Sequence, residues 1–120
     1  MISKLSLELA VKALKSLGLT EMDAQVYVYL AKKGPREEKD LANALKLTKR
    51  QLFFSLENLV AKGMVSSSRE RSVKYSAIAL EKVLEQYLKT RKEQVKTLKA
   101  SRDEFLSAWR SIIKDDHENS

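Results

Sequence analysis

The sequence has no cysteine, one proline, three glycines and one histidine in 120 residues. Lack of cysteine excludes disulfides, thiolate metal ligands and cysteine nucleophiles, and is typical of a cytosolic protein. No run of 18 apolar residues occurs, so no membrane span is predicted, and the N-terminal stretch is too charged for a signal peptide. The isolated glycines form no phosphate-binding loop. We therefore expect neither an enzyme nor a cofactor, and no metal site in the polar C-terminal cluster Asp115-Asp116-His117-Glu118.

Basic residues outnumber acidic residues 23 to 16, and the excess is unevenly distributed. Residues 1–78 hold 14 Lys or Arg and 8 Asp or Glu, whereas residues 79–120 hold 9 and 8. Within residues 46–75 the counts are 7 and 2, so +5 of the net charge of +7 lies in a quarter of the chain. A local basic excess favours a polyanionic partner, most often nucleic acid. An ordinary solvated basic surface is the alternative.

The N-terminal third has the apolar spacing of two helices. Apolar residues recur at intervals of three and four over residues 5–17, which predicts a helix that ends at Gly18. Thr20 is a suitable N-cap for a second helix, with acidic residues in its first turn. The apolar run 24–31 has the composition of a strand, but the cap before it and the Gly-Pro pair after it indicate a buried helix.

A helix-turn-helix pattern follows. A short polar helix is predicted over residues 36–45, and three residues join it to a second helix over residues 49–62. Thr48 and Gln51 have the spacing of a capping box, in which each side chain bonds the backbone N–H of the other. Gly63 occupies the position of the glycine that ends such a helix. Two short helices with a tight turn and a basic start to the second are typical of this motif.

A β-hairpin is predicted directly after the second helix. Met64-Val65 opens a short strand, residues 66–72 are polar and turn-like, and residues 73–77 alternate apolar and polar side chains. A hairpin in this position is a wing, here residues 64–78. Residues 1–78 are therefore predicted to form a mainly α, α+β winged helix-turn-helix domain that binds DNA.

The predicted helix 49–62 has two different faces. On a helical wheel, four aliphatic residues fall on the buried side: Leu52, Leu56, Leu59 and Val60. The other side and the N-terminal end carry the candidate DNA contacts Lys49, Arg50, Gln51, Phe54 and Asn58. Arginine donates two hydrogen bonds to guanine, and glutamine or asparagine pairs with adenine, so Arg50 and Gln51 are the first candidates for base reading. Contacts to phosphates or solvent alone are the alternative.

Phe54 and the wing supply the remaining candidates. Phe54 points away from the buried face, where phenylalanine is unexpected. It is placed either to contact thymine methyl groups or to pack against another part of a dimer. Arg69, Arg71 and Lys74 on the hairpin are predicted to contact phosphates or the minor groove, the alternative being charge that only keeps the hairpin in solution.

The rest of the chain predicts one long helix, residues 80–114, followed by a polar tail, residues 115–120. At 1.5 Å per residue the helix is about 50 Å long, too long for an 80-residue domain to cover. Steps of four and three residues give a heptad seam interrupted by Arg91 and Arg102. We expect its apolar members to pair with a second copy, in a parallel or antiparallel manner: Leu84, Leu88, Val95, Leu98, Phe105, Trp109 and Ile112. Folding back onto its own domain is the alternative.

Several motifs resemble the TrmB-like archaeal transcriptional regulators. The segment LGLTEMDAQVY at residues 17–27 opens the match, which continues through Lys33-Gly34-Pro35 and Lys39-Asp40-Leu41-Ala42. It ends with LENLVAKGMV at residues 56–65 and VKYSA at residues 73–77. The resemblance covers residues 14–80, the whole winged-helix region.

The resemblance implies a dimeric winged-helix DNA-binding protein whose long C-terminal helix mediates pairing. Phe53 stands where the family often has tyrosine, and Phe54 where a polar or charged residue is usual, so the family's base contacts are not carried over. Such regulators also carry a sugar-sensing C-terminal domain. This sequence ends after the long helix, so we expect no such domain and infer no small-molecule effector.

The prediction is a homodimeric, sequence-specific, double-stranded DNA-binding transcriptional regulator, cytoplasmic and nucleoid-associated. Helix 49–62 is expected in the major groove, and hairpin 64–78 on the flanking backbone or in the minor groove. One alternative is a chromatin protein with almost no sequence preference. The other is an adaptor that binds proteins, which Phe54 favours.

Overall fold

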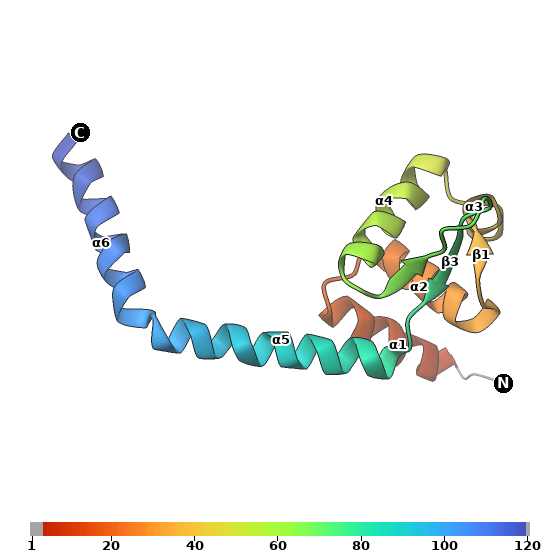
Figure 1. The fold of residues 1–120 in the computed structure, drawn as a ribbon, viewed down its shortest axis with the longest axis horizontal. Helices are drawn as coiled ribbons and strands as arrows, with labels where there is room; N and C mark the ends of the chain where they lie inside the picture. The colour runs from red at the N-terminus through yellow and green to blue at the C-terminus, as the bar shows by residue number, and fades with distance from the viewer. Residues whose placement is uncertain (1–3, 120) are drawn as a thin grey trace. The chain divides into compact units, whose positions relative to one another are not determined.

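The computed structural model describes residues 4–119, and the side chains of residues 4–115 (Figure 1). The chain divides after Val83 into two units, each described separately below. The first unit contains four helices: α1 (Lys4–Ser16), α2 (Glu21–Lys33), α3 (Glu38–Leu45) and α4 (Lys49–Ala61). It also contains three short strands: β1 (Arg36–Glu37), β2 (Val65–Ser67) and β3 (Lys74–Ala77).

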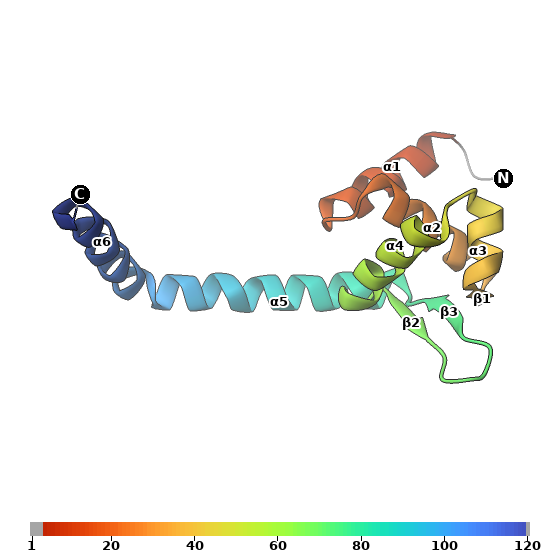
Figure 2. The ribbon, with the colours of Figure 1, turned by 90° about the horizontal axis from the view of Figure 1, so that it is seen from above.

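The strands form an antiparallel sheet in the order β1-β3-β2. Val65 lies opposite Ala77, so β2 and β3 form the predicted hairpin, which projects from the helices in Figure 2. Arg36 lies opposite Tyr75 on the other edge of β3. The prediction that the helix after Gly34-Pro35 starts at residue 36 was wrong, because residues 36–37 are extended and pair with the hairpin. Two residues are too few to show the alternation that identifies a strand in a sequence.

The core of the first unit is made by aliphatic side chains from its helices and from the base of the hairpin. On α4 the buried positions are Leu52, Ser55, Leu56 and Leu59, which follow the three- and four-residue spacing of one helical face. The prediction that Val60 lies on this face was wrong: 42% of its surface is exposed, since position 60 falls beyond the edge of the buried sector.

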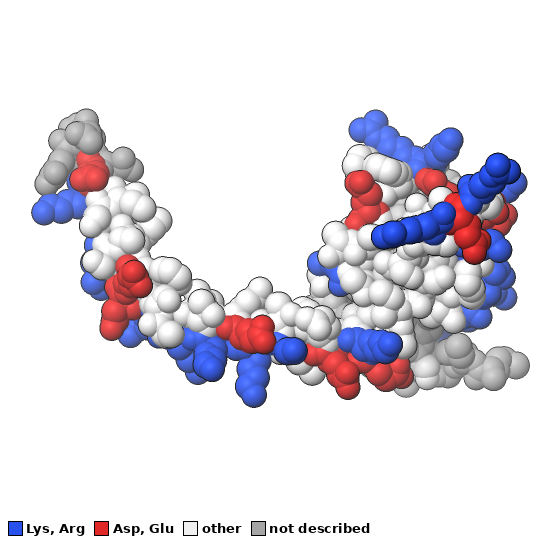
Figure 3. Space-filling model, in the orientation of Figure 1, with Lys and Arg blue, Asp and Glu red and all other residues white. Residues whose placement is uncertain are grey.

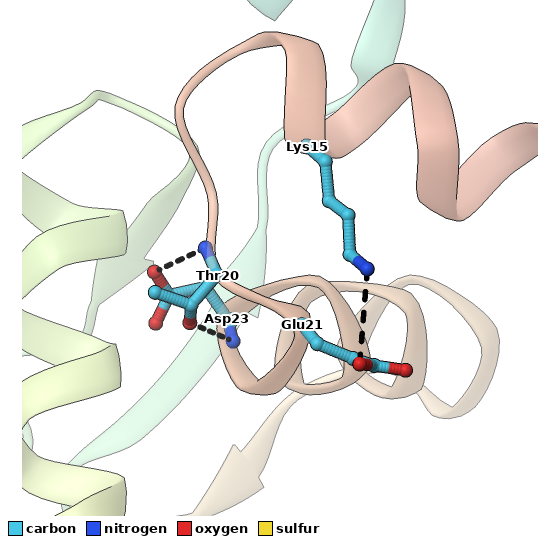
Figure 4. A network of polar contacts seen from close by, with 4 residues as sticks. All are labelled: Lys15, Thr20, Glu21 and Asp23. Atoms are coloured by element: carbon cyan, nitrogen blue, oxygen red, sulfur yellow. Dashed lines mark hydrogen bonds and ion pairs between the residues drawn. The ribbon is translucent and has the colours of Figure 1, made fainter.

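The N-terminus of α2 is fixed by the predicted cap. Thr20 Oγ1 accepts a 3.1 Å hydrogen bond from Asp23 N, and Asp23 Oδ2 accepts one of 3.2 Å from Thr20 N (Figure 4). Nearby, Lys15 Nζ lies 3.7 Å from Glu21 Oε2, an ion pair between α1 and α2. The sequence prediction of a helix rather than a strand over residues 24–31 is confirmed.

Two helices follow the hairpin: α5 (Leu80–Ala100) and α6 (Arg102–Asn119). The first residues of α5 belong to the first unit, where Val83 is buried in the core and Tyr27 Oη donates a 2.6 Å hydrogen bond to the Ile78 carbonyl. In the part of the chain described, no helix is both long and apolar enough to span a bilayer.

The prediction of one uninterrupted helix over residues 80–114 was wrong, because the helix breaks at Ser101. The residues Ser101-Arg102-Asp103-Glu104 have the spacing of a capping box, and both acidic residues lie in the first turn of α6. The backbone N–H of Ser101 still donates to the Thr97 carbonyl and that of Phe105 to the Ser101 carbonyl, so the interruption is local. The helix then continues to Asn119, through most of the segment predicted as a polar tail.

Candidate nucleic-acid interface

The start of α4 is rigidly capped. Thr48 Oγ1 accepts a 3.1 Å hydrogen bond from Gln51 N, and Gln51 Oε1 accepts one of 3.0 Å from Thr48 N. The turn before it is tight because Lys46 adopts a left-handed conformation with φ of 56°. The predicted capping box is therefore confirmed, and it occupies the Oε1 atom of a side chain that is also a candidate for base reading.

The end of α4 is fixed by a Schellman motif that also anchors the wing. Gly63 has a φ of 72°, its N–H donates to the Val60 carbonyl, and the Met64 N–H donates to the Leu59 carbonyl. Met64 and Val65 are then buried, which holds the first strand of the hairpin against the core. Both ends of α4 are thus determined, so its exposed face has a defined position relative to the wing.

The exposed face of α4 is a basic and aromatic cluster. Phe53 and Phe54 are 49% and 57% exposed, and their ring centroids lie 5.8 Å apart in an edge-to-face arrangement. The guanidinium carbon of Arg50 lies 5.8 Å from the centroid of the Phe54 ring, a cation–π distance. We call Arg50, Phe53 and Phe54 the α4 cluster. Phe53 was not among the predicted contacts, because on the wheel it falls at the border of the buried face.

Asn58 differs from the other candidates on α4. Its Nδ2 atom donates a 2.6 Å hydrogen bond to Oδ2 of the buried Asp23 on α2. The amide is therefore used inside the first unit, between α4 and α2.

The wing is held to the helices through its loop. Ser68 N donates to the Lys74 carbonyl at 2.8 Å, Lys74 N donates to Ser68 Oγ at 2.9 Å, and the Ser72 hydroxyl donates to Glu37 Oε1. The predicted contacts Arg69, Arg71 and Lys74 are all exposed. The loop therefore presents its basic side chains from a constrained backbone.

One groove joins the wing to the start of α4. Its basic lining residues come from three elements: Lys39 of α3, Lys49 of α4 and Arg71 of the wing. Glu37 and Glu38 line it as well. In Figure 3, Lys and Arg side chains gather with some acidic ones at the upper end of the first unit, where α4 begins and the hairpin loop lies in Figure 1. We call Lys39, Lys49 and Arg71 the basic groove; Lys39 was missed because its proximity to the wing depends on tertiary packing.

A second groove lies between α4 and the hairpin. It is lined by Phe53, Phe54 and Val60 from the helix and by Ser67 and Tyr75 from the strands. Burial, followed by the nearby Glu38 carboxylate, raises the pKa of Tyr75. The α4 cluster thus faces a largely apolar surface on one side and the basic groove near its N-terminal end.

The predicted seam residues lie on both sides of Ser101. Leu84, Leu88, Val95 and Leu98 belong to α5, and Phe105, Trp109 and Ile112 to α6; all are exposed in the single chain. Figure 3 shows charged residues of both signs along one edge of these helices and almost none along the other. Among the described residues there is no group of three or more metal-ligating side chains, and the side chains of the cluster at residues 116–118 lie outside the description.

The winged-helix region matches a known protein family. The model of the "Sugar-specific transcriptional regulator TrmB" family matches residues 14–81, more than half of the chain. The chain belongs to the TrmB family. No curated protein sequence matches it.

Solved structures share the winged-helix fold of this TrmB-family chain. TrmBL2, an archaeal chromatin protein, is similar with a TM-score of 0.72 and 24% identity over 90% of this chain, which spans 44% of the TrmBL2 chain. ST1889 from Sulfolobus tokodaii is similar with a TM-score of 0.62 and 24% identity over 76% of this chain and 96% of its own. MepR, a transcription regulator from Staphylococcus aureus, is similar with a TM-score of 0.53 and 19% identity over 95% of this chain and 90% of its own. The mainly α winged-helix prediction is confirmed, and the family is one of transcriptional regulators rather than enzymes.

Proposed function

We propose that this TrmB-family protein is a homodimeric transcriptional regulator that binds specific sites in double-stranded DNA. Helix α4 enters the major groove, and the wing, residues 64–78, contacts the flanking backbone or minor groove. The observation that carries the proposal is the basic groove, in which Lys49 and Arg71 line one surface although they come from different elements. In this proposal, both side chains contact the phosphate backbone that flanks the inserted helix.

Arg50 is the principal base-reading residue in this proposal. It lies in the first turn of α4, where a recognition helix contacts base edges, and its guanidinium carbon lies 5.8 Å from the centroid of the Phe54 ring. This cation–π contact favours a guanidinium beside the ring, from which arginine donates two hydrogen bonds to guanine. Phe54 then lies beside the base step that Arg50 reads, where a thymine methyl group makes an apolar contact. Gln51 contributes through its exposed amide, while Asn58 supports α4 through Asp23.

Two copies are joined through their C-terminal helices. The exposed apolar residues of α5 and α6 leave an apolar face uncovered in the single chain, and covering such a face favours association. A two-fold dimer presents two copies of α4, so its half-sites lie about one helical turn, or a multiple of it, apart. Such a protein acts in the cytoplasm, on the nucleoid.

A second candidate function is binding to DNA of almost any sequence, as a chromatin protein. The α4 cluster favours it, since Phe53 and Phe54 replace hydrogen-bonding side chains on the exposed face of the helix. The similarity to TrmBL2, described as an archaeal chromatin protein, points the same way. The third candidate, a protein-binding adaptor, would use the same exposed aromatic rings.

Selection of binding sites from random duplex DNA tests these candidates. A regulator prefers its selected site over random duplexes by about 10³-fold or more at matched salt. Binding to all duplexes within about tenfold of each other would instead identify a chromatin protein. If the protein bound no duplex even at low salt, the protein-binding adaptor would be the remaining candidate function.

A further inference from the structure

An apolar groove lies between α1 and α2, away from the wing and α4. Its floor is formed by five side chains from three helices: Leu7, Val11, Val28, Tyr29 and Leu45. All but Leu7 are partly buried against the core, and Leu7 is 43% exposed. The groove measures about 670 Å³, so several large side chains fit into it. Nothing in the first unit covers this floor among the residues described.

The rim of the groove is basic. Four lysines and two glutamates line it, a net charge of +2: Lys4, Lys12, Lys15, Lys32, Glu8 and Glu21. Lys15 and Glu21 pair with each other (Figure 4), which leaves three lysines and Glu8 to face an incoming partner. An amphipathic helix with an acidic surround has the complementary character.

Helix α6 has that character. Its exposed apolar residues are spaced by four, three and one, so they share one face: Phe105, Trp109, Ile112 and Ile113. The α6 sequence holds five acidic and three basic residues, a net charge of −2, and its acidic residues lie at the two ends of the helix: Asp103 and Glu104 before Phe105, and Asp115, Asp116 and Glu118 after Ile113. Helix α5 holds six basic and three acidic residues, a net charge of +3, so it does not complement the lysine rim.

The dimensions agree as well. Phe105 and Ile112 lie seven residues apart, which is about 10 Å along a helix. The groove extends along α1 from Lys4 to Lys15, about 16 Å. Phe105, Trp109 and Ile112, which span this length of helix, therefore fit within the groove with room for polar residues at either end.

The interruption at Ser101 separates the apolar residues of α6 from those of α5. A coiled-coil seam follows a regular heptad repeat along one helix, and here the helix is interrupted between Leu98 and Phe105. The apolar residues of α6 are then not a simple extension of those on α5.

We propose that α6 of one copy docks into the α1–α2 groove of a second copy, with Phe105, Trp109 and Ile112 as anchors. This inference rests on the proposed homodimer and specifies part of its interface: α5 pairs along its own seam, and α6 crosses to the partner. Docking of α6 into the groove of its own chain is the competing arrangement, and the double-cysteine variant below tests it.

Single cysteines test the docking in a chain that has none of its own. Lys12→Cys on the groove rim is mixed with Arg110→Cys on α6, the two chains carrying different tags, under mild oxidation. Docking holds the two thiols at a high effective concentration, so the mixed disulfide forms at least about tenfold faster than with Lys96→Cys on α5 as partner. Equal rates for the two pairings overturn the proposal. So does a disulfide formed only within single chains of a Lys12→Cys, Arg110→Cys double variant.

A matched pair of substitutions on α1 gives a second readout. Leu7 lines the groove, whereas Leu9 is 59% exposed and does not line it. Leu7→Glu places an unpaired carboxylate against the docked helix and raises the dimer dissociation constant at least about tenfold, while Leu9→Glu changes it less than about threefold. Sedimentation velocity measures the constants, and circular dichroism verifies that both variants fold. Equal effects of the two substitutions overturn the docking.

The same measurements separate this inference from the homodimer itself. Leu88→Glu, on the α5 seam, tests pairing without touching the groove. A wild-type chain that sediments as a monomer would refute the homodimer and the docking together. A wild-type dimer that Leu88→Glu dissociates and Leu7→Glu leaves intact would refute the docking alone.

Discussion

The side-chain amide of Asn58 donates a 2.6 Å hydrogen bond to Oδ2 of Asp23, which joins α4 to the start of α2. Asp23 is buried and also accepts from the Thr20 backbone, so its carboxylate has two protein partners. The contact fixes α4 against its support at a point one turn before its C-terminus. Asn58 is thus better explained as a positioning residue than as a base-reading one.

Asn58→Ala is expected to lower the free energy of unfolding by about 1–3 kcal/mol, because a buried carboxylate loses one partner. The affinity of the folded protein for its selected duplex should change less than about twofold. Denaturant unfolding and duplex titration measure the two quantities, with Glu57→Ala as an exposed neighbouring control. Unchanged stability together with weaker DNA binding would instead indicate that Asn58 contacts a base.

Arg50→Ala is expected to cost about 1–3 kcal/mol of binding free energy at the selected site and to relax the preference at one base pair. Arg50→Lys keeps the charge but loses the planar fork, so it should restore affinity for random duplexes without restoring the preference. Site selection with each variant measures both effects. Wild-type preference in Arg50→Ala would remove this residue from the readers.

Gln51→Glu separates the cap from the DNA contact. A glutamate completes a capping box as well as glutamine does, and a negative charge is favourable at a helix N-terminus, so the free energy of unfolding should be equal or higher. The same charge repels phosphates, so affinity for all duplexes should fall. Thermal unfolding compares the stability of wild type and Gln51→Glu, and duplex titration compares their affinity for DNA. Undiminished DNA binding would show that the start of α4 lies away from the duplex.

Local signals in the sequence determined most of the elements of the first unit. The Thr20 cap, the Thr48–Gln51 capping box and the Gly63 terminus each depend on residues within a few positions, and all three formed as predicted. The capping-box spacing that begins at Ser101 is equally local, but the apolar spacing on both sides of it favoured one continuous helix.

Contacts between distant residues could not be read from spacing. The Asn58–Asp23 bond joins positions 35 apart, and the same separation divides Ser72 from Glu37, the pair that links the wing loop to the end of β1. The basic groove depends on the second of these contacts. The side chains that share it were therefore only partly predicted: Lys49 and Arg71, but not Lys39.

Arg71→Ala tests the wing. Removing one phosphate contact should weaken binding to selected and random duplexes alike and reduce the slope of log affinity against log salt by about 1. Titrations at three or more salt concentrations give the slope, and Lys89→Ala, an exposed change on α5, serves as the control. An unchanged slope in Arg71→Ala would exclude the wing tip from the DNA contact.

Tyr27 links the stability of the first unit to alkaline pH. Burial, followed by the Glu81 carboxylate, raises the pKa of Tyr27 above its ordinary value of 10.0. Above about pH 10 the unfolded chain therefore loses this proton before the folded chain does, so the unfolded state binds fewer protons and the free energy of unfolding falls as pH rises. Below that pH both states keep the proton and this contribution is constant.

Tyr27→Phe should lower the free energy of unfolding by about 1 kcal/mol at pH 7, because the hydrogen bond to the Ile78 carbonyl is lost. It also removes the ionisable hydroxyl, so the gap between wild type and variant should narrow as the pH rises from 9 to 11. Urea unfolding of both chains at several pH values measures the gap. Tyr87→Phe on α5 controls for loss of a hydroxyl. A constant gap would show that Tyr27 ionises equally readily in the folded and unfolded chains, and a widening gap that it ionises more readily in the folded chain; either result contradicts the prediction.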